Sequence, residues 1–164
     1  DRLAAIEKEK ADKIEAIKRV KEEFATEIEA EKAKATTLPS GLKVLTLKDG
    51  DGEKPKVGQK VNVMYAGYLM DGTLFDSNYE EVARKYGTFD SNREKGGGYM
   101  PVPMDYSPES RLVAGFREAL LTMKVGDKLR IFIPPHLGWG AQGSGPIPAN
   151  ADLVFDLEIT GLTQ

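Results

Sequence analysis

Few side chains in this sequence could perform acid–base, nucleophilic or metal chemistry. Among 164 residues there is one histidine, His136, and no cysteine, which excludes disulfides, thiolate metal sites and Cys–His catalysis. A Ser–His–Asp triad would have to use His136, which follows Pro134 and Pro135, and no nucleophile-elbow motif precedes a helical pattern. We therefore interpret His136 as a structural or exposed loop residue.

Two glycine-rich stretches match ligand-binding motifs only in part. Residues 138–143 read GWGAQG and fit G-x-G-x-x-G, but Pro146 and Pro148 follow, so no helix can begin there to hold a pyrophosphate. Residues 49–52 read DGDG and resemble the start of a calcium loop, yet the twelfth position is Lys60, where a bidentate glutamate is required. The sequence thus predicts no metal and no cofactor.

The elements that must position any site change character near residue 36. Residues 1–35 contain no Gly and no Pro, and consist largely of Ala, Glu, Lys and Ile, which favours one long helix. Leu3, Ile14, Ile28 and their apolar neighbours form one stripe on it. The stripe predicts packing against this or a neighbouring domain, or a homodimer through the helix. We assign residues 1–36 to this helix and residues 37–164 to a second domain.

The second domain carries β-strand patterns. Apolar residues alternate with other residues at 61–69, 129–133 and 153–159, and a turn at 71–72 returns the chain through 73–76. Such alternation predicts an antiparallel sheet with one buried face. An apolar stripe over residues 112–123 predicts one helix that packs on that face. The expected fold class is α+β, with a long helix preceding it.

Composition limits the partners and the setting. The formal net charge of −3 argues against nucleic acid or an anionic membrane as the main partner. No apolar run approaches the roughly 20 residues that cross a bilayer, and we find no signal segment. Because the chain begins at Asp1, we expect a processed or excised fragment. The composition is compatible with either the cytoplasm or the periplasm.

Four segments together resemble the FKBP family of peptidyl-prolyl cis-trans isomerases. Their order and spacing hold over residues 41–162, apart from an enlarged loop at about 78–110, in which we expect a short helix near residues 80–86. The resemblance implies a twisted antiparallel sheet wrapped around one short helix, with an apolar pocket between them. The segments are VMYAGYL at 63–69 running into DGTLFDS at 71–77, LVAGF at 112–116, MKVGD at 123–127, and IPPHLGWG at 133–140 followed by IPANADLVFD at 147–156.

The resemblance also assigns roles by position. It implies that Tyr65, Asp76 and Phe155 are catalytic, although an inward-facing Tyr65 or Phe155 would by itself be an ordinary core residue. Asp76 differs, because a carboxylate beside apolar residues costs free energy unless it is hydrogen-bonded. The residues implied to bind substrate are Phe75, Leu112, Val113, Phe116, Trp139 and Ile147.

The sequence departs from the family pattern at the pocket. Phe116 stands where the family usually has tryptophan, and Trp139 stands where it usually has tyrosine, which exchanges a hydroxyl for an indole N–H. An aromatic residue before the helix is not matched, and Val102 or Met104 is its nearest counterpart. These departures bear most on affinity for macrolide inhibitors such as tacrolimus and rapamycin.

The implied activity is rotation about Xaa-Pro peptide bonds of protein substrates. An apolar pocket would bind the twisted imide without covalent or metal chemistry. The alternative is a chaperone or proline-motif binding module with low isomerase turnover. The implied partners are proline-containing polypeptides, and some bacterial relatives place such a domain after a helical arm.

Overall fold

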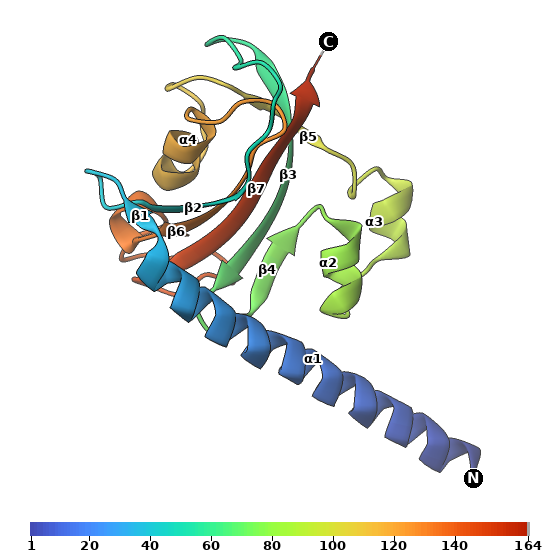
Figure 1. Cartoon of the computed structure of the whole chain (residues 1–164). Helices are drawn as coiled ribbons and strands as arrows, with labels where there is room; N and C mark the ends of the chain where they lie inside the picture. Colours follow the sequence, from blue (N-terminus) through green and yellow to red (C-terminus); the bar gives the residue numbers. More distant parts are fainter. Residues whose placement is uncertain (164) are drawn as a thin grey trace.

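A seven-stranded antiparallel sheet forms the centre of the computed structural model, which describes residues 1–163 (Figure 1). The strand order is β1-β2-β6-β7-β3-β4, and β5 pairs with the first part of β3. The long strands β3 and β7 lie side by side, with Tyr65 opposite Leu157. The strands are β1 (Thr36–Thr37), β2 (Lys43–Lys48), β3 (Lys60–Leu69), β4 (Leu74–Ser77), β5 (Val102–Asp105), β6 (Lys128–Ile133) and β7 (Leu153–Leu162).

The helix α4 (Ala114–Leu120) packs on one face of this sheet and closes the main core. The two elements approach closely, because a Cβ atom on Gly115 would lie 2.9 Å from Ile133 of β6. The expected α+β architecture is confirmed. The helix is shorter than the stripe at 112–123 predicted, since Val113 is extended, with ψ of 142°, and α4 begins only after it.

The helix α1 (Arg2–Lys34) covers the opposite face of the sheet with its second half (Figure 1). Ile28 is fully buried there, and the rings of Phe24 and Tyr68 lie 4.3 Å apart. The sequence predicted one buried sheet face, and this was wrong. Phe132 and Val154, which point away from α4, are also buried, because α1 and its neighbours cover them.

A buried ion-pair network joins α1 to the sheet. Arg130 donates to both carboxylate oxygens of Asp156, at 2.6 and 2.8 Å, and to Glu31 of α1 at 2.6 Å. The side chains of Arg130 and Asp156 are only 10% and 9% exposed. Burial opposes the charge on Arg130, but the two carboxylates hold the pKa of its guanidinium above the ordinary value.

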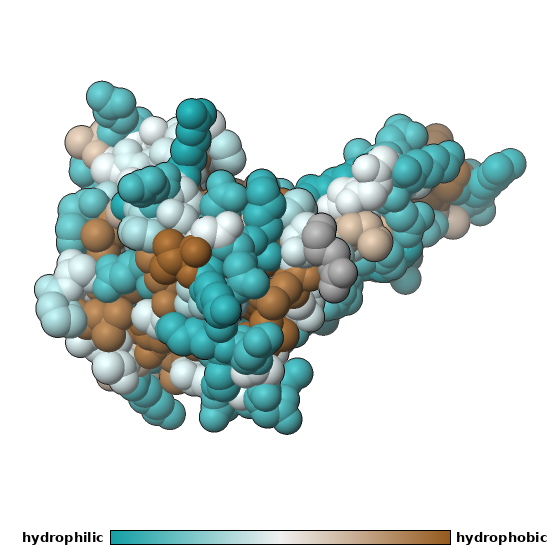
Figure 2. Space-filling view, turned by 90° about the horizontal axis from the view of Figure 1, so that it is seen from above, coloured by the Kyte–Doolittle hydropathy of each residue, from teal (hydrophilic) through white to brown (hydrophobic). Residues whose placement is uncertain are grey.

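The first half of α1 extends beyond the sheet as an arm (Figure 1). Leu3 and Ile14 are 63% and 68% exposed, and Figure 2 shows the arm from above as mostly hydrophilic with a few hydrophobic side chains. Packing on its own domain therefore accounts for the second half of the apolar stripe only. Across residues 1–163, no helix combines the length and apolar character needed to cross a bilayer.

The enlarged segment between β4 and β5 folds as two short helices, α2 (Glu80–Lys85) and α3 (Ser91–Lys95). The sequence predicted the first helix and missed the second. Asn78 fixes both ends of the segment to the sheet. Its Nδ2 donates to the carbonyls of Val63 and Met100 at 3.0 and 3.1 Å, and its Oδ1 accepts from the Tyr65 N–H at 2.7 Å.

Candidate active site

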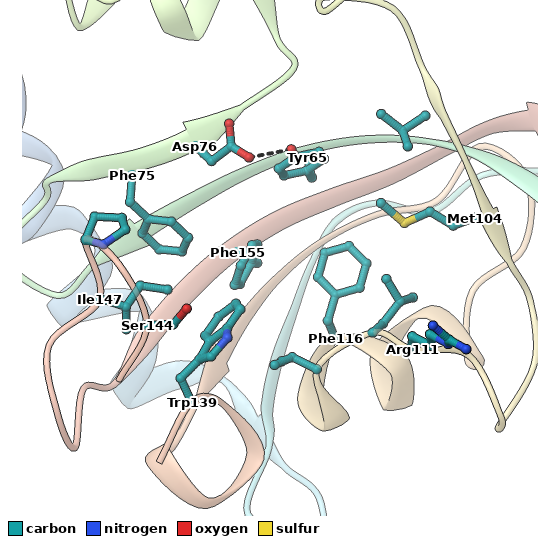
Figure 3. A pocket seen from close by; sticks show the side chains of 14 residues that line it. Tyr65, Phe75, Asp76, Met104, Arg111, Phe116, Trp139, Ser144, Ile147 and Phe155 are labelled. Carbon is teal, nitrogen blue, oxygen red and sulfur yellow. Dashed lines mark hydrogen bonds between the residues drawn. The ribbon is translucent and has the colours of Figure 1, made fainter. Parts of the chain in front are cut away.

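A hollow of about 540 Å³ lies between α4, β5 and the sheet (Figure 3). All nine site residues named from the sequence line it. Five others join them, of which Val102 and Met104 were the counterparts considered for the missing aromatic. The predicted residues are Tyr65, Phe75, Asp76, Leu112, Val113, Phe116, Trp139, Ile147 and Phe155, and the additional ones are Val102, Met104, Arg111, Ser144 and Pro146.

Aromatic rings packed edge to face build the floor and one wall. The ring of Phe155 lies 5.3 Å from Phe116 and 5.4 Å from Phe75, with interplanar angles of 88° and 84°. Phe75 meets Trp139 at 6.5 Å and 87°. Edge-to-face packing is the arrangement that the ring quadrupoles favour. Gly67 makes room for it, since a Cβ there would lie 2.6 Å from the Phe75 ring.

One carboxylate faces this apolar lining. Asp76 Oδ2 accepts a hydrogen bond from the Tyr65 hydroxyl at 2.6 Å (Figure 3). Asp76 Oδ1 accepts the Ser77 N–H at 2.9 Å and lies 3.4 Å from Arg93 of α3. Asp76 is thus held by three donors at the rim.

The same contacts control the proton on Tyr65. Burial, together with the hydrogen bond and the negative charge of Asp76, raises the pKa of Tyr65 to about 12. The hydroxyl therefore stays protonated at neutral pH and donates to Asp76. The Tyr65 backbone is fixed from the other side by the Asn78 side chain.

The glycine-rich loop at 138–143 positions Trp139 and does not begin a helix. The Trp139 carbonyl accepts the Gly143 N–H at 3.1 Å, and the Asn150 N–H donates to Gly140 at 2.8 Å. Ser144 and Ile147 then form a bridge that closes the loop. Pro146 and Ile147 consequently lie on the wall of the hollow near Trp139.

His136 lies outside the hollow. Its Nε2 is 2.8 Å from the carbonyl oxygen of Ser40, in the segment that connects β1 to β2. This contact agrees with the structural interpretation of His136.

The backbone N–H of Val113 and the indole N–H of Trp139 lie at the hollow and have no acceptor within the described residues. Neither the Val113 N–H, at the start of α4, nor the indole N–H of Trp139 donates to any group within residues 1–163. Both residues line the hollow, so both donors are available to a bound molecule.

Sequence reasoning missed Arg93, Arg111, Ser144 and Pro146. Arg93 belongs to α3, inside the enlarged segment, and no local pattern links it to Asp76 seventeen residues earlier. Arg111 immediately precedes the LVAGF segment, so its position was visible while its orientation was not. In the described part of the chain, no three His, Asp or Glu side chains gather as a metal site would require.

The chain belongs to the FKBP-type peptidyl-prolyl cis-trans isomerase family, whose sequence model matches residues 51–160. It is 35% identical to the FKBP-type peptidyl-prolyl cis-trans isomerase FkpA of Aeromonas hydrophila, over 99% of this chain and 53% of that protein. It is 37% identical to FK506-binding protein 1 of Dictyostelium discoideum, over 73% of this chain and 95% of that protein. The family resemblance predicted from the sequence is confirmed.

Solved structures of proteins from the same family superpose on this chain. FkpA from Escherichia coli superposes with a TM-score of 0.61 at 30% identity, covering 98% of this chain and 64% of that one. A peptidyl-prolyl cis-trans isomerase from Pseudomonas syringae superposes with 0.60 at 28% identity, covering 92% and 96%. The chain spans about half the length of the Aeromonas relative, and only 15% of human FKBP9, to which it is 38% identical.

Proposed function

We propose that this chain catalyses cis/trans rotation about Xaa-Pro bonds of polypeptides in the hollow between α4 and the sheet. The observation that carries the proposal is the open, ring-lined hollow with the Tyr65–Asp76 hydrogen bond at its rim. Membership of the isomerase family supports it. The hollow contains no histidine, cysteine or lysine that would perform covalent chemistry.

The rotation is slow because amide resonance must be broken, with a barrier of about 18–20 kcal/mol. The twisted imide has lost that resonance, and its carbonyl is less polar than in the planar form. Water stabilises the planar form, whereas an apolar, water-poor pocket favours the twisted one. Phe75, Phe116 and Phe155 supply such surroundings.

In the proposed pose the proline ring rests on Phe116, between Tyr65 and Phe155. The Val113 N–H holds a substrate carbonyl, and Trp139 lies over the residue before the proline. The two free donors described above support these contacts. Asp76 orients Tyr65 and transfers no proton, since the hydroxyl of Tyr65 has a pKa of about 12.

An exchange assay by NMR on a short Xaa-Pro peptide tests the proposal. We expect wild-type turnover, and about a tenfold lower kcat/KM for Asp76→Ala, because a hydrogen bond to a charged group is worth about 1.5–3 kcal/mol. Asp51→Ala is the matched control, since Asp51 is exposed and has no ion pair in the described residues. A wild-type rate equal to the uncatalysed rate would reject the proposal.

A binding module with low turnover is the second candidate. Val102 lines the hollow and is 37% exposed, and Met100, two residues earlier, is 62% exposed; both offer apolar surface to an extended chain. Peptide binding measured by NMR titration, set against turnover of the same peptide, separates the two functions. Tight binding with no rate enhancement would favour this second candidate.

FK506-type macrolides are the proposed inhibitors of the same hollow, as the name of the Dictyostelium relative suggests. Trp139 and Phe116 alter the ring surfaces that such a ligand would meet. Titration of FK506 into the exchange assay, with wild type and Trp139→Tyr, tests this. A tighter complex in the variant is the expected result, because tyrosine restores the hydroxyl donor that is usual in the family.

We also propose that the exposed arm of α1 forms a homodimer. Leu3, Ile6 and Ile14 support this, since they are at least 40% exposed on one helix. Removing all of α1 would strip Ile28 from the core, so a cleaner test is Ile6→Lys with Ile14→Lys. The mass in solution should fall from dimer to monomer, and an unchanged mass would reject the proposal.

A further inference from the structure

Arg111 is a cation at the rim of the hollow that the catalytic scheme above does not use. It lies between β5 and α4 and lines the hollow with Met104 and Phe116. Figure 3 places Arg111 at one end of the hollow, beyond the ring of Phe116, whereas Trp139 lies farther along, beside the ring of Phe155. A peptide that crosses these rings would therefore meet Trp139 at one end and Arg111 at the other.

Arg117 holds the backbone on both sides of Arg111, whereas the Arg111 side chain makes no hydrogen bond within the described residues. Arg117 Nη1 donates to the carbonyls of Ser110 and Leu112, at 3.2 and 3.0 Å, on either side of Arg111. The residue itself is exposed. Within residues 1–163 its guanidinium has no ion-pair partner. It is thus available to a carboxylate on a bound molecule.

No acidic side chain in the described residues pairs with Arg111, and Asp105 of β5 pairs with Lys60 instead. Asp76 is the one acidic residue in the described lining, and it already accepts from Tyr65 and pairs with Arg93. Arg117, on the helix beneath, adds a second cation near this end. The whole chain has a formal charge of −3 and would repel anions at long range, so any preference for an anion must arise locally.

We infer that Arg111 makes the site select substrates with an acidic residue directly after the proline. The inference rests on the proposed isomerase function. In the pose proposed above, the residue before the proline lies under Trp139. The residue after the proline therefore faces the other end of the hollow, where Arg111 lies. A glutamate or aspartate there would meet Arg111 beside an apolar wall, where a charge pair is screened less than in open water.

The test uses three peptides that differ only after the proline, with Glu, Gln or Lys at that position. At low salt we expect kcat/KM for the Glu peptide to exceed that for the Lys peptide by about threefold to tenfold, the range of a partly exposed pair and its repulsive counterpart. Arg111→Gln should bring the ratio to about one, and Arg111→Glu should invert it. High salt should reduce the wild-type ratio.

The controls separate this inference from the proposed function. Lys56→Glu makes the same charge change as Arg111→Glu at an exposed residue outside the hollow, and it should leave the ratio at its wild-type value. Measurable turnover of the Gln peptide by Arg111→Gln reports that this variant folds. Affinities of the three peptides, measured by NMR titration, test the preference even if turnover is absent.

A ratio that Arg111→Gln leaves unchanged would overturn the inference while the proposed function stands. So would an equal change in Lys56→Glu, which would indicate overall charge alone. A preference that appears only when the acidic residue precedes the proline would also overturn it, because Arg111 would then serve the other end of the peptide. If the wild-type chain turned over none of the three peptides but still bound the Glu peptide more tightly than the Lys peptide, the isomerase function alone would be rejected.

Discussion

The two faces of the sheet carry similar aromatic clusters, but only one of these clusters is covered by another element. On one face, Phe24 of α1 packs on Tyr68, which in turn lies 5.9 Å from Tyr86. On the other face, Phe116 and Phe155 meet at 5.3 Å and border an open hollow. The residue types alone do not separate core from site, because what differs is whether another element covers the rings.

Polar groups follow the same division. Behind the sheet they find partners inside the chain, as when the Tyr86 hydroxyl donates to the Gly72 carbonyl at 2.8 Å and Arg130 binds Asp156. At the hollow, the Val113 N–H and the Trp139 indole have none within the described chain. Behind the sheet these polar groups are thus paired inside the chain, whereas on the open face these two donors are not paired within the described residues.

The largest expected effect is on the covered face. Asp156→Ala leaves Arg130 buried with only the α1 carboxylates, and breaking a buried pair from one side costs roughly 3 kcal/mol. Urea unfolding measures this, with Glu27→Ala as the control, since Glu27 is largely exposed and 3.5 Å from Arg130. Equal losses from both variants would contradict the division between buried network and surface.

A matched pair of aromatic deletions compares the two faces directly. Phe155→Ala should lower kcat/KM at least about tenfold, because the wall of the site is lost. It should cost about 3 kcal/mol of stability, the low end for a buried phenylalanine, because the ring borders an open hollow. Phe24→Ala should cost about as much stability and leave kcat/KM unchanged. Peptide exchange and urea unfolding, measured on both variants, test these expected changes in kcat/KM and stability. Normal turnover in Phe155→Ala would remove that residue from the site.

A smaller effect concerns pH. Because burial and Asp76 raise the pKa of Tyr65 to about 12, kcat/KM should stay level from pH 7 to 10. The unfolded chain releases this proton near its ordinary pKa of about 10, so the stability that Tyr65 contributes is present below pH 10 and falls as pH rises toward 12. In Tyr65→Phe, the free energy of unfolding should fall less steeply as pH rises from 10 toward 12, by up to about 1.4 kcal/mol per pH unit.

An alkaline drop in activity near pH 10 that disappears in Tyr65→Phe would argue against the raised pKa. The other tyrosines give an internal comparison, since burial also raises the pKa of Tyr86, on the covered face, to about 12. Tyr86→Phe should alter the pH dependence of stability in the same direction while leaving peptide turnover unaffected.

The smallest effect is expected from the arm. Deleting residues 1–13 removes exposed ion pairs such as Glu9–Lys13 and no buried side chain. Surface pairs of this kind contribute less than about 1 kcal/mol. Urea unfolding, monitored at a concentration where the mass is monomeric, should therefore give a stability close to that of the intact chain. A large loss would mean that the arm supports the fold.

The sequence predicted much of the fold and the site. Strand periodicity located β3, β4, β6 and β7, and the absence of Gly and Pro located α1. It missed the short strands β1, β2 and β5 and the helix α3. These are stabilised by pairing or capping contacts, such as Asp90 accepting from the Asn92 N–H, and not by an apolar pattern of their own.

All nine predicted site residues line the hollow because motifs in register carry spatial information that single residues lack. Arg93, Arg111 and Pro146 could not be assigned in this way. Arg111 and Pro146 line the hollow from loops, and Arg93 reaches Asp76 at its rim from the enlarged segment. The paths of these segments depend on contacts such as the Asn78 hydrogen bonds.

The sequence by itself determined the helix, the alternating strands, the family and the scarcity of reactive side chains. These depend on local propensity, on periodicity and on motif order. Only the tertiary structure decided that α1 lies over one sheet face, that Arg130 is buried in an ion-pair network, and that Arg111 lines the hollow with no ion-pair partner in the described residues. Such outcomes depend on which distant surfaces meet, because burial and pairing depend on neighbours in space and not in the chain.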